Sequence, residues 1–517
     1  MDDKPQETGG GDETREQGQT RGQGQTRGQG ETREQGQIRE RDGTPGWGRA
    51  LAWVGRGRRA RFGSAAAGCA VLGGVLVLLP WERGAEVPPE PAPGALARAA
   101  VASGVPASLP GLEALVEERE RHLKKHPKDA ESWAVLGAAR VEQGRRLADP
   151  ARYSRAEQAL RTSLKVRPRD NAAALRGLAA LANARHDHPA ALEWGERARK
   201  LEPERWTTYP PLVEAYTGLG DGEAAGRMLD RLKALRSDPA VMALAAAVYR
   251  DKGLREDAAA QLSDAAAAAG EPAERAAYLE RAGQLAWERG DREDALGHFR
   301  EALRIDPDQG AAQAGQGRVL AALGRTTEAL GAYRAALAGQ PLPEYELELG
   351  ELYESLGLRQ DARVHYDLVR SRVREAAAHG ADGDLVLGRF EADHGDPRAA
   401  VRRLRTEWER QPSTAVADAL GWALHRSGRS EEALEFAVRA MEGATEEAHG
   451  GGVRSALHAF HRGMIELELD EDGPARRHLR EALSINPYFS PLRVPQAKAA
   501  LERLGEPPVG GGPPDWS

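Results

Sequence analysis

The sequence AYLERAGQLAWERGDREDALGHFREALRIDP, residues 277–307, decides the fold, because it holds two helical patterns with a break between them. The first pattern is a face of small or apolar residues at i, i+3, i+4 and i+7: Leu279, Ala282, Gly283 and Ala286. Gly290 and Asp291 break this helix, and a second face of Ala295, Phe299 and Ala302 ends before Pro307. The stretch therefore predicts one helix-turn-helix unit.

The same unit recurs along the chain. Glycines expected at its turns occupy positions 290, 324, 357, 395 and 428, separated by 34, 33, 38 and 33 residues. We count ten units between Trp133 and Pro487, and we expect the turn of the first unit to be about seven residues longer than the others. A small residue such as Gly317 at the eighth position of each unit lets its two helices approach closely. The series predicts a solenoid.

This pattern resembles the tetratricopeptide repeat (TPR), whose period is about 34 residues. The segment AWERGDREDALGHFREALRIDP is a close match, and GMIELELDEDGPARRHLREALSINPYFSPL resembles the closing repeat of many bacterial TPR proteins. The resemblance covers roughly residues 112–504 and implies an all-α superhelical solenoid. It also implies a protein or peptide ligand in the concave groove formed by the first helices, with neither a cofactor nor a small-molecule substrate.

Composition agrees with stacked small-residue helices. The chain has 517 residues, only 5% aromatic side chains and one cysteine, Cys69, so no disulfide within the chain can staple the fold. The formal net charge is -7, and about +2 of charge lies in residues 1–63, which leaves about -9 on the remainder. This balance argues against nucleic-acid binding by the folded part. The preference for Arg over Lys suggests a GC-rich bacterial genome.

Residues 1–61 are expected to be a disordered, low-complexity cytoplasmic tail. Within them, residues 14–40 repeat a six-residue pattern, TREQGQ and TRGQGQ, with an arginine in each copy and almost no apolar side chain. Such a segment cannot bury enough surface to offset the entropy cost of ordering its backbone. Glutamates such as Glu16 and Glu34 cancel much of the arginine charge, which favours a solvated tail over a lipid or RNA contact.

Residues 62–81, FGSAAAGCAVLGGVLVLLPW, are predicted to form a transmembrane helix. This run of 20 has no charged side chain and is long enough to cross a bilayer core of about 30 Å. The arginines just before it predict a single-pass protein in the cell membrane, with its N-terminus in the cytoplasm and its repeats outside. Two alternatives are a buried helix of a soluble protein and a cleaved signal peptide, although about 60 residues would precede the latter's apolar region.

The rest of the chain divides into three parts. Residues 82–110 contain six prolines and are expected to be a linker, and residues 505–517 a disordered tail. Residues 111–504 are assigned to the solenoid. Within it, residues 112–127 are expected to be a lone helix that covers the first repeat.

Groove residues can be projected from the repeat register. The ninth position of the first helices carries Arg318, Glu351, Arg389 and Trp422 among others. We expect Trp287 and Trp422 to project into the groove, where packing does not require them, since exposed Trp with Arg is common at binding hot spots. An alternative is that the alternating charges form an internal ladder between neighbouring helices. The candidate protein-binding residues are Trp287, Arg318, Glu351, Arg389, Trp422 and Arg426.

No catalytic motif is recognisable in the sequence. Three histidine pairs are close in sequence, at 122 and 126, 186 and 188, and 458 and 461, but none has a local third metal ligand. We interpret them as solvated or capping residues, and predict that the protein is not an enzyme. A glycine-rich phosphate loop, a GxSxG elbow and an HExxH motif are all missing from the chain.

Two further hypotheses remain beside that of a membrane-anchored scaffold. WAVLGAARVEQGR, after a membrane helix, is similar to the TPR part of cytochrome c biogenesis factors, which implies an assembly factor in a maturation pathway. The other is an enzyme with a histidine-bound metal, the weaker of the two because no complete ligand set is present.

Overall fold

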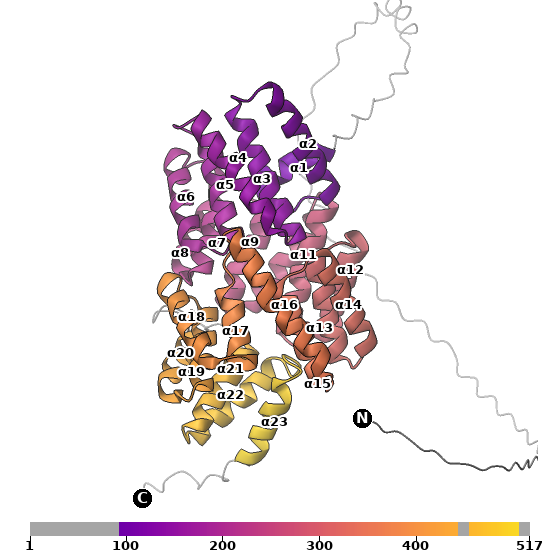
Figure 1. Ribbon diagram of the computed structural model, residues 1–517, viewed down its shortest axis with the longest axis vertical. Coiled ribbons are helices and arrows are strands. Elements are labelled where there is room, and N and C mark those ends of the chain that lie inside the picture. Colours follow the sequence, from indigo (N-terminus) through magenta and orange to yellow (C-terminus); the bar gives the residue numbers. More distant parts are fainter. Residues whose placement is uncertain (1–92, 443–453, 506–517) are drawn as a thin grey trace, which may run out of the picture. The chain divides into compact units, whose positions relative to one another are not determined.

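The computed structural model describes residues 93–442 and 454–505, and within these ranges the chain is entirely helical (Figure 1). All of these residues belong to one compact unit. The predictions for residues 1–61, for the membrane span at 62–81 and for nearly all of the C-terminal tail lie outside the described residues. None of the helices in the described ranges is long and apolar enough to cross a membrane.

Ten helix pairs follow one another between residues 130 and 485, as predicted. The first helices of the pairs are α3 (Ala130–Leu147), α5 (Ala172–Ala184), α7 (Pro210–Gly218), α9 (Pro239–Asp251), α11 (Pro272–Glu288), α13 (Gly310–Ala322), α15 (Pro343–Ser355), α17 (Asp384–His394), α19 (Thr414–Arg426) and α21 (Ala456–Glu468). The second helices are α4 (Pro150–Val166), α6 (His188–Leu201), α8 (Gly222–Leu235), α10 (Arg255–Ala268), α12 (Arg292–Ile305), α14 (Thr326–Gly339), α16 (Arg359–Ala378), α18 (Pro397–Arg410), α20 (Ser430–Glu442) and α22 (Asp472–Ile485). A short 3-10 helix, η1 (Trp206–Thr208), precedes α7.

The turns within the pairs use the expected glycines. Gly290, Gly324, Gly357 and Gly428 adopt positive φ angles between 74° and 84°, which L side chains adopt only with strain. Gly395 differs, with φ at -136°, so its turn does not need a glycine for this reason. Aspartates cap several helices, as when Asp187 accepts a hydrogen bond from the backbone N–H of Ala190.

The eighth-position glycines pack as the register predicts. A Cβ placed on Gly283, Gly317 or Gly350 would lie 2.5–2.8 Å from the aromatic ring that stands 16 residues later. These rings belong to Phe299, Tyr333 and Tyr366, respectively. In the first pair, Gly137 faces Leu160 instead, 23 residues later. The seven extra residues lengthen α3 as far as Leu147 and leave a short turn, which corrects the expectation of a longer turn.

The N-terminal end of the solenoid differs from the prediction. Helix α1 (Pro93–Ser103) lies within the segment assigned to the linker, and it packs against α2 (Leu109–Lys125). The helix expected to stand alone is therefore paired. The small side chains of Ala97 and Ala100 make this pairing possible, since they are buried against Leu112 and Leu115. At the other end α23 (Arg493–Leu504) covers α21 and α22.

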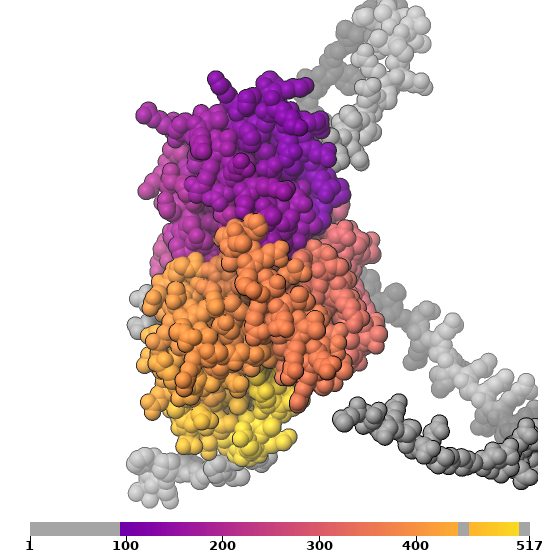
Figure 2. All heavy atoms as spheres, in the orientation of Figure 1, coloured from indigo at the N-terminus to yellow at the C-terminus, as the bar shows by residue number. Residues whose placement is uncertain are grey.

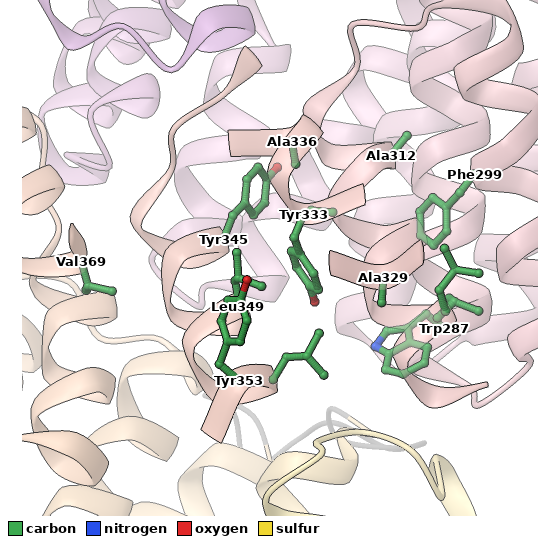
Figure 3. Packing of buried hydrophobic residues seen from close by; sticks show 14 of the residues in the cluster. Trp287, Phe299, Ala312, Ala329, Tyr333, Ala336, Tyr345, Leu349, Tyr353 and Val369 are labelled. Atoms are coloured by element: carbon green, nitrogen blue, oxygen red, sulfur yellow. The ribbon is translucent and has the colours of Figure 1, made fainter. Parts of the chain in front are cut away.

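Buried side chains from neighbouring pairs join into extended cores. The largest runs from α11 to α17 (Figure 3). In this core Phe299, Tyr333, Tyr353 and Val369 alternate with alanines at the helix crossings, including Ala329, which has no exposed surface. Stacking of this kind gives each repeat its core only through its neighbours.

The array winds back onto itself, so that parts of the chain 160 to 225 residues apart are bonded together. We call this set of contacts the seam. Its members are the ion pair Arg146–Asp306, the hydrogen bonds from Gln340 to the carbonyls of Arg145 and Arg146, Ser154–His379, the backbone bond from Asp382 to Arg185, His188–Gln411, and the bond from Asn486 to the carbonyl of Trp287. About six repeats of 34 residues therefore make one superhelical turn.

Candidate functional site

Two hollows lie on the concave surface of the superhelix. The first has a volume of about 940 Å³ and is lined by α1, α3, α5, α7, α9 and α11, together with the loops between them. The second, about 440 Å³, is lined by α15, α17, α19 and α21, by the loop after α5, and by Phe489, Ser490 and Arg493. Both hollows are formed mainly by first helices, which is the position that the repeat register predicts for a binding groove.

The first hollow has a floor of small residues and a charged wall. Ala134, Ala138, Gly177 and Ala247 line it and leave space next to the helix backbones. Seven arginines and five carboxylates also line it. Several are paired across the groove, as Arg176 is with Glu202 and Arg145 with Glu214.

Four charged groups in the first hollow stand out. Arg167 and Arg281 form no ion pair with any described residue, and neither do Asp170 and Glu280. Burial raises the pKa of the Glu280 carboxyl, although the nearby cations Arg281 and Arg318 oppose this effect. The lining of the hollow therefore includes two guanidinium groups and two carboxyl groups that form no ion pair among the described residues.

The second hollow combines an apolar wall with one unpaired arginine. Leu385, Val386, Trp422 and Phe489 supply the wall, and six carboxylates line the remainder. Arg389 also lines this hollow, and among the described residues it has neither an ion pair nor a hydrogen-bond partner for its buried Nε.

The structure brings three of the six predicted residues together. Glu351, Arg389 and Trp422 line the second hollow, whereas Trp287, Arg318 and Arg426 line neither hollow. Arg426 lies beside the site, where its Nε donates to the carbonyl of Ala392 and its guanidinium lies 5.9 Å from the ring of Trp422. A binding role for these residues remains a prediction.

The expectation that the two tryptophans are free of packing is wrong. Only 6% of Trp287 is exposed, because it lies in the largest core and the segment around Asn486 packs over its turn. Gly290 in the same turn is so close to this segment that an added Cβ would lie 3.2 Å from the Cα of Asn486. Contact across the seam therefore buries a residue that the register places at the groove.

Trp422 is 4% exposed and is held by polar as well as apolar contacts. Its Nε1 donates a 2.8 Å hydrogen bond to Asp393, and the ring of His461 stacks on it at 4.2 Å. Asp393 in turn pairs with Arg493, which lies over the tryptophan ring. Trp422 is thus a core residue that presents one edge to the hollow.

The alternative to a binding role, that the alternating charges form an internal ladder between neighbouring helices, is correct for Arg318. Its guanidinium lies 2.9 Å from Glu348 and donates a 2.7 Å hydrogen bond to Gln284, so it links three successive first helices. Glu351 lies 3.5 Å from His394. Three of the projected ninth positions carry charged residues: Arg318, Glu351 and Arg389. Of these, only Arg389 forms no ion pair with a described residue.

Sequence reasoning missed the first hollow, because the groove register was projected only from residue 284 onward. The sequence did contain a signal for it, because the ninth positions of earlier first helices carry small residues of the floor, such as Ala138 and Ala247. It also missed a buried polar cluster in which His461 Nδ1 lies 2.9 Å from Asp418 and His458 Nε2 lies 3.8 Å from it. Burial alone would raise the pKa of the Asp418 carboxyl, but the two facing rings outweigh burial and lower it.

The histidine pairs do not assemble a metal site in the described chain. His458 and His461 are buried against Asp418, so the interpretation as solvated or capping residues is wrong for this pair. His122 bonds to Asp129 at 2.9 Å. Within residues 93–442 and 454–505, the one three-residue group close enough to share an ion is Asp382, Asp384 and Glu407, which contains no histidine. Arg410 and Arg403 already pair with these carboxylates.

Comparison with known proteins supports the repeat assignment. The sequence profile of the tetratricopeptide repeat family matches residues 141–205, 243–309, 281–346 and 315–377. No curated protein matches the chain in sequence. These matches identify tetratricopeptide repeats within residues 141–205 and 243–377, and the ten helix pairs support the same repeat along the rest of the solenoid. Such repeats form scaffolds for protein–protein interaction, and they are typically not catalytic.

Solved structures with partial likeness are helical proteins of low sequence identity. The human IFIT1 dimer with PPP-AAAA shares 18% identity over 63% of this chain and 77% of its own, with a TM-score of 0.42. Cut9 with Hcn1, from the APC/C hetero-tetramer, shares 15% over 73% and 76%, with a TM-score of 0.38. Pseudomonas aeruginosa PilF shares 18% over 41% and 98%, with a TM-score of 0.33.

Proposed function

We propose that this protein is a scaffold anchored in a bacterial cell membrane by residues 62–81, with its solenoid outside the cytoplasm. The solenoid binds a protein or peptide partner on its concave surface. The observation that carries the binding part is the pair of hollows formed by successive first helices. The uncharged run of residues 62–81 and the arginines before it support the anchoring part.

A topology measurement tests the anchor. Reporter enzymes, one active only inside the cell and one only outside, are fused after residue 92, so that helix α1 is not interrupted. The proposal expects activity only from the outside reporter. A matched fusion after residue 61, ahead of the apolar run, should be active only inside. Cytoplasmic activity of the fusion after residue 92 would contradict the proposed orientation.

A crosslinking measurement tests the binding surface. A photoreactive amino acid is placed in the full-length chain at Ala138, which lines the first hollow, or at Ala260, which is exposed on the second helix α10. Partner proteins should be trapped from position 138 and not from position 260. If only position 260 traps a protein, the concave surface is not the binding surface.

A further inference from the structure

The seam determines how a partner can reach the first hollow. It fastens the loops of one superhelical turn to the next at several points. Near α3 the ion pair Arg146–Asp306 is 2.6 Å long, and its side chains are only 11% and 15% exposed. Farther along, a backbone hydrogen bond of 2.7 Å joins Asp382 to Arg185. On the face shown in Figure 2, atoms of the indigo and orange parts meet without a gap.

The first hollow is enclosed by a complete turn of the superhelix. Helices α1 and α11 lie at the two ends of a run of six pairs, and both line the same hollow. Because the seam closes the side of the array, the hollow is reached along the superhelical axis. A folded domain of about 50 residues has a radius of gyration of about 10 Å, which corresponds to a sphere of about 8,000 Å³, far more than the hollow holds.

We propose that the first hollow binds an extended, acidic segment of a partner protein, which enters along the superhelical axis while the seam stays closed. This inference rests on the proposed scaffold function and deepens it by naming the kind of partner. The small side chains of the floor leave room for a peptide backbone, and the unpaired Arg167 and Arg281 offer two sites for carboxylates. Glu202 is shared by Arg176 and Arg205, which leaves further positive charge on the wall.

Single-stranded RNA is the competing anionic occupant, and the lining favours a peptide. Proteins that hold single strands stack the bases on aromatic side chains and follow the phosphates with uninterrupted positive charge. Two aromatic side chains, Trp206 and Tyr278, line this hollow, but Tyr278 is only 1% exposed, and five carboxylates interrupt the arginines. These carboxylates would repel the negative charge that RNA carries at every nucleotide, whereas a peptide is charged only at its acidic side chains and its backbone N–H groups can donate hydrogen bonds to the carboxylates.

The experiment uses a reversible lock across the seam. A Cβ at Gly220 would lie 3.8 Å from the Cβ of Ser413, the separation of a normal disulfide, although the φ of +70° at Gly220 and the 3.2 Å approach to the carbonyl oxygen of Pro412 strain a side chain there. The full-length chain therefore carries Gly220→Cys, Ser413→Cys and Cys69→Ser. The probes are random displayed peptides of about twelve residues, about 40 Å long when extended, selected on the reduced protein. Each selected peptide is then measured on the oxidised and the reduced protein.

Variants of the hollow identify where the peptides bind. Ala138→Trp fills the first hollow, and Ala260→Trp is its matched control on the exposed face of α10. Arg281→Glu tests the charge without adding bulk, with Arg398→Glu, exposed on α18 and without an ion pair among the described residues, as its control. Circular dichroism melts of each variant show whether it folds, and Arg281→Glu replaces Ala138→Trp if the latter does not.

The expected result has three parts. Selected peptides are acidic, bind the oxidised and reduced proteins with equal affinity, and bind the Ala138→Trp and Arg281→Glu proteins at least about tenfold more weakly, a change of about 1.4 kcal/mol. Binding only to the reduced protein would show that the seam must open, and would overturn the inference. Peptides that are insensitive to both hollow variants, or tighter binding of an RNA of the same length in the hollow, would also overturn it.

Failure of this inference can be distinguished from failure of the proposed function. If position 138 still traps a native partner while the oxidised lock abolishes that trapping, the scaffold binds a partner that needs the seam open. The proposed function then stands and the axial entry does not. If position 138 traps nothing in either state, no partner occupies the first hollow, and this inference is wrong.

Discussion

The guanidinium of Arg146 lies 2.6 Å from the carboxylate of Asp306, which is 160 residues farther along the chain. One group ends α3 and the other follows α12, so the pair joins the first and fifth repeats. Gln340, at the end of α14, donates to the backbone carbonyl of Arg146 and brings a third element to the same point. A linear stack of repeats would have no such contact, and the pair shows that the superhelix closes on itself.

Removal of one partner of this pair should destabilise the whole array. Arg146→Ala leaves the carboxylate of Asp306 largely buried without its counter-ion, so we expect a loss on the order of 3 kcal/mol in the free energy of unfolding. Urea denaturation measures this loss. Arg227→Ala removes a partner from an exposed pair with Glu223, 57% and 72% exposed, and should cost less than about 1 kcal/mol. Similar small losses for both variants would show that the seam adds little stability.

Enlargement of Gly317 should separate the helices of the sixth repeat. A Cβ at this position would lie 2.8 Å from the ring of Tyr333, so Gly317→Ala is already strained and Gly317→Trp should cost about 2 to 4 kcal/mol. Gly331, on α14 of the same repeat, has no atom within 4 Å of an added Cβ. Gly331→Ala should therefore be neutral or stabilise by up to about 1 kcal/mol. Thermal melts rank these variants, and an unchanged melt for Gly317→Trp would refute the register.

Trp422→Ala should behave as a core substitution. The side chain is 4% exposed, stacks on His461 and donates to Asp393, so its removal should lower the free energy of unfolding by about 3 to 5 kcal/mol. Trp422→Phe keeps the stacking and removes the Nε1–H donor, so it should cost clearly less. Denaturation is measured together with binding of the selected peptides or trapped partner. A normal melt with a large loss of binding would instead show that Trp422 is a binding residue of the groove and not a core residue.

The stability of the protein should fall in mild acid, partly because of His425. Burial, assisted by the nearby His461 and Arg426, lowers the pKa of this imidazole to about 4 from its ordinary 6.5. Between these two pH values the unfolded chain binds a proton at this site that the folded chain does not, so protonation favours unfolding. The free energy of unfolding therefore decreases as pH falls from about 6.5 to about 4.

Replacement of His425 tests that assignment. His425→Gln removes the titrating ring, and the difference in unfolding free energy between pH 6.5 and pH 4 should become smaller than in the parent. His126→Gln, at an exposed position, serves as the control and should leave the difference unchanged. Burial also lowers the pKa of His188 and His458, so part of the pH dependence should persist in the His425 variant. An unaltered slope would mean that His425 is protonated in the folded state.

Much of the fold could be predicted because each repeat is decided locally. The packing of Gly283 on Phe299 and of Gly317 on Tyr333 follows from spacings within one period, since a small residue was predicted at the eighth position, where the paired helices approach. The position of the groove on the first helices follows from the same register. Helix α1 was missed because prolines before and after it were interpreted as a linker, while Ala97 and Ala100 gave no strong apolar signal.

The sequence by itself determined the ten helix pairs between residues 130 and 485 and the faces that pack within a pair. Only the tertiary structure decided which side chains remain free at the concave surface. The small rotation between successive repeats accumulates over about six of them, and no local pattern encodes that sum. It brings Asn486 onto the turn after Trp287 and Asp306 onto Arg146, across separations of 199 and 160 residues. The rotation therefore buries a tryptophan predicted to be free and encloses the first hollow, whose small floor residues the local pattern contains but whose enclosure it does not encode.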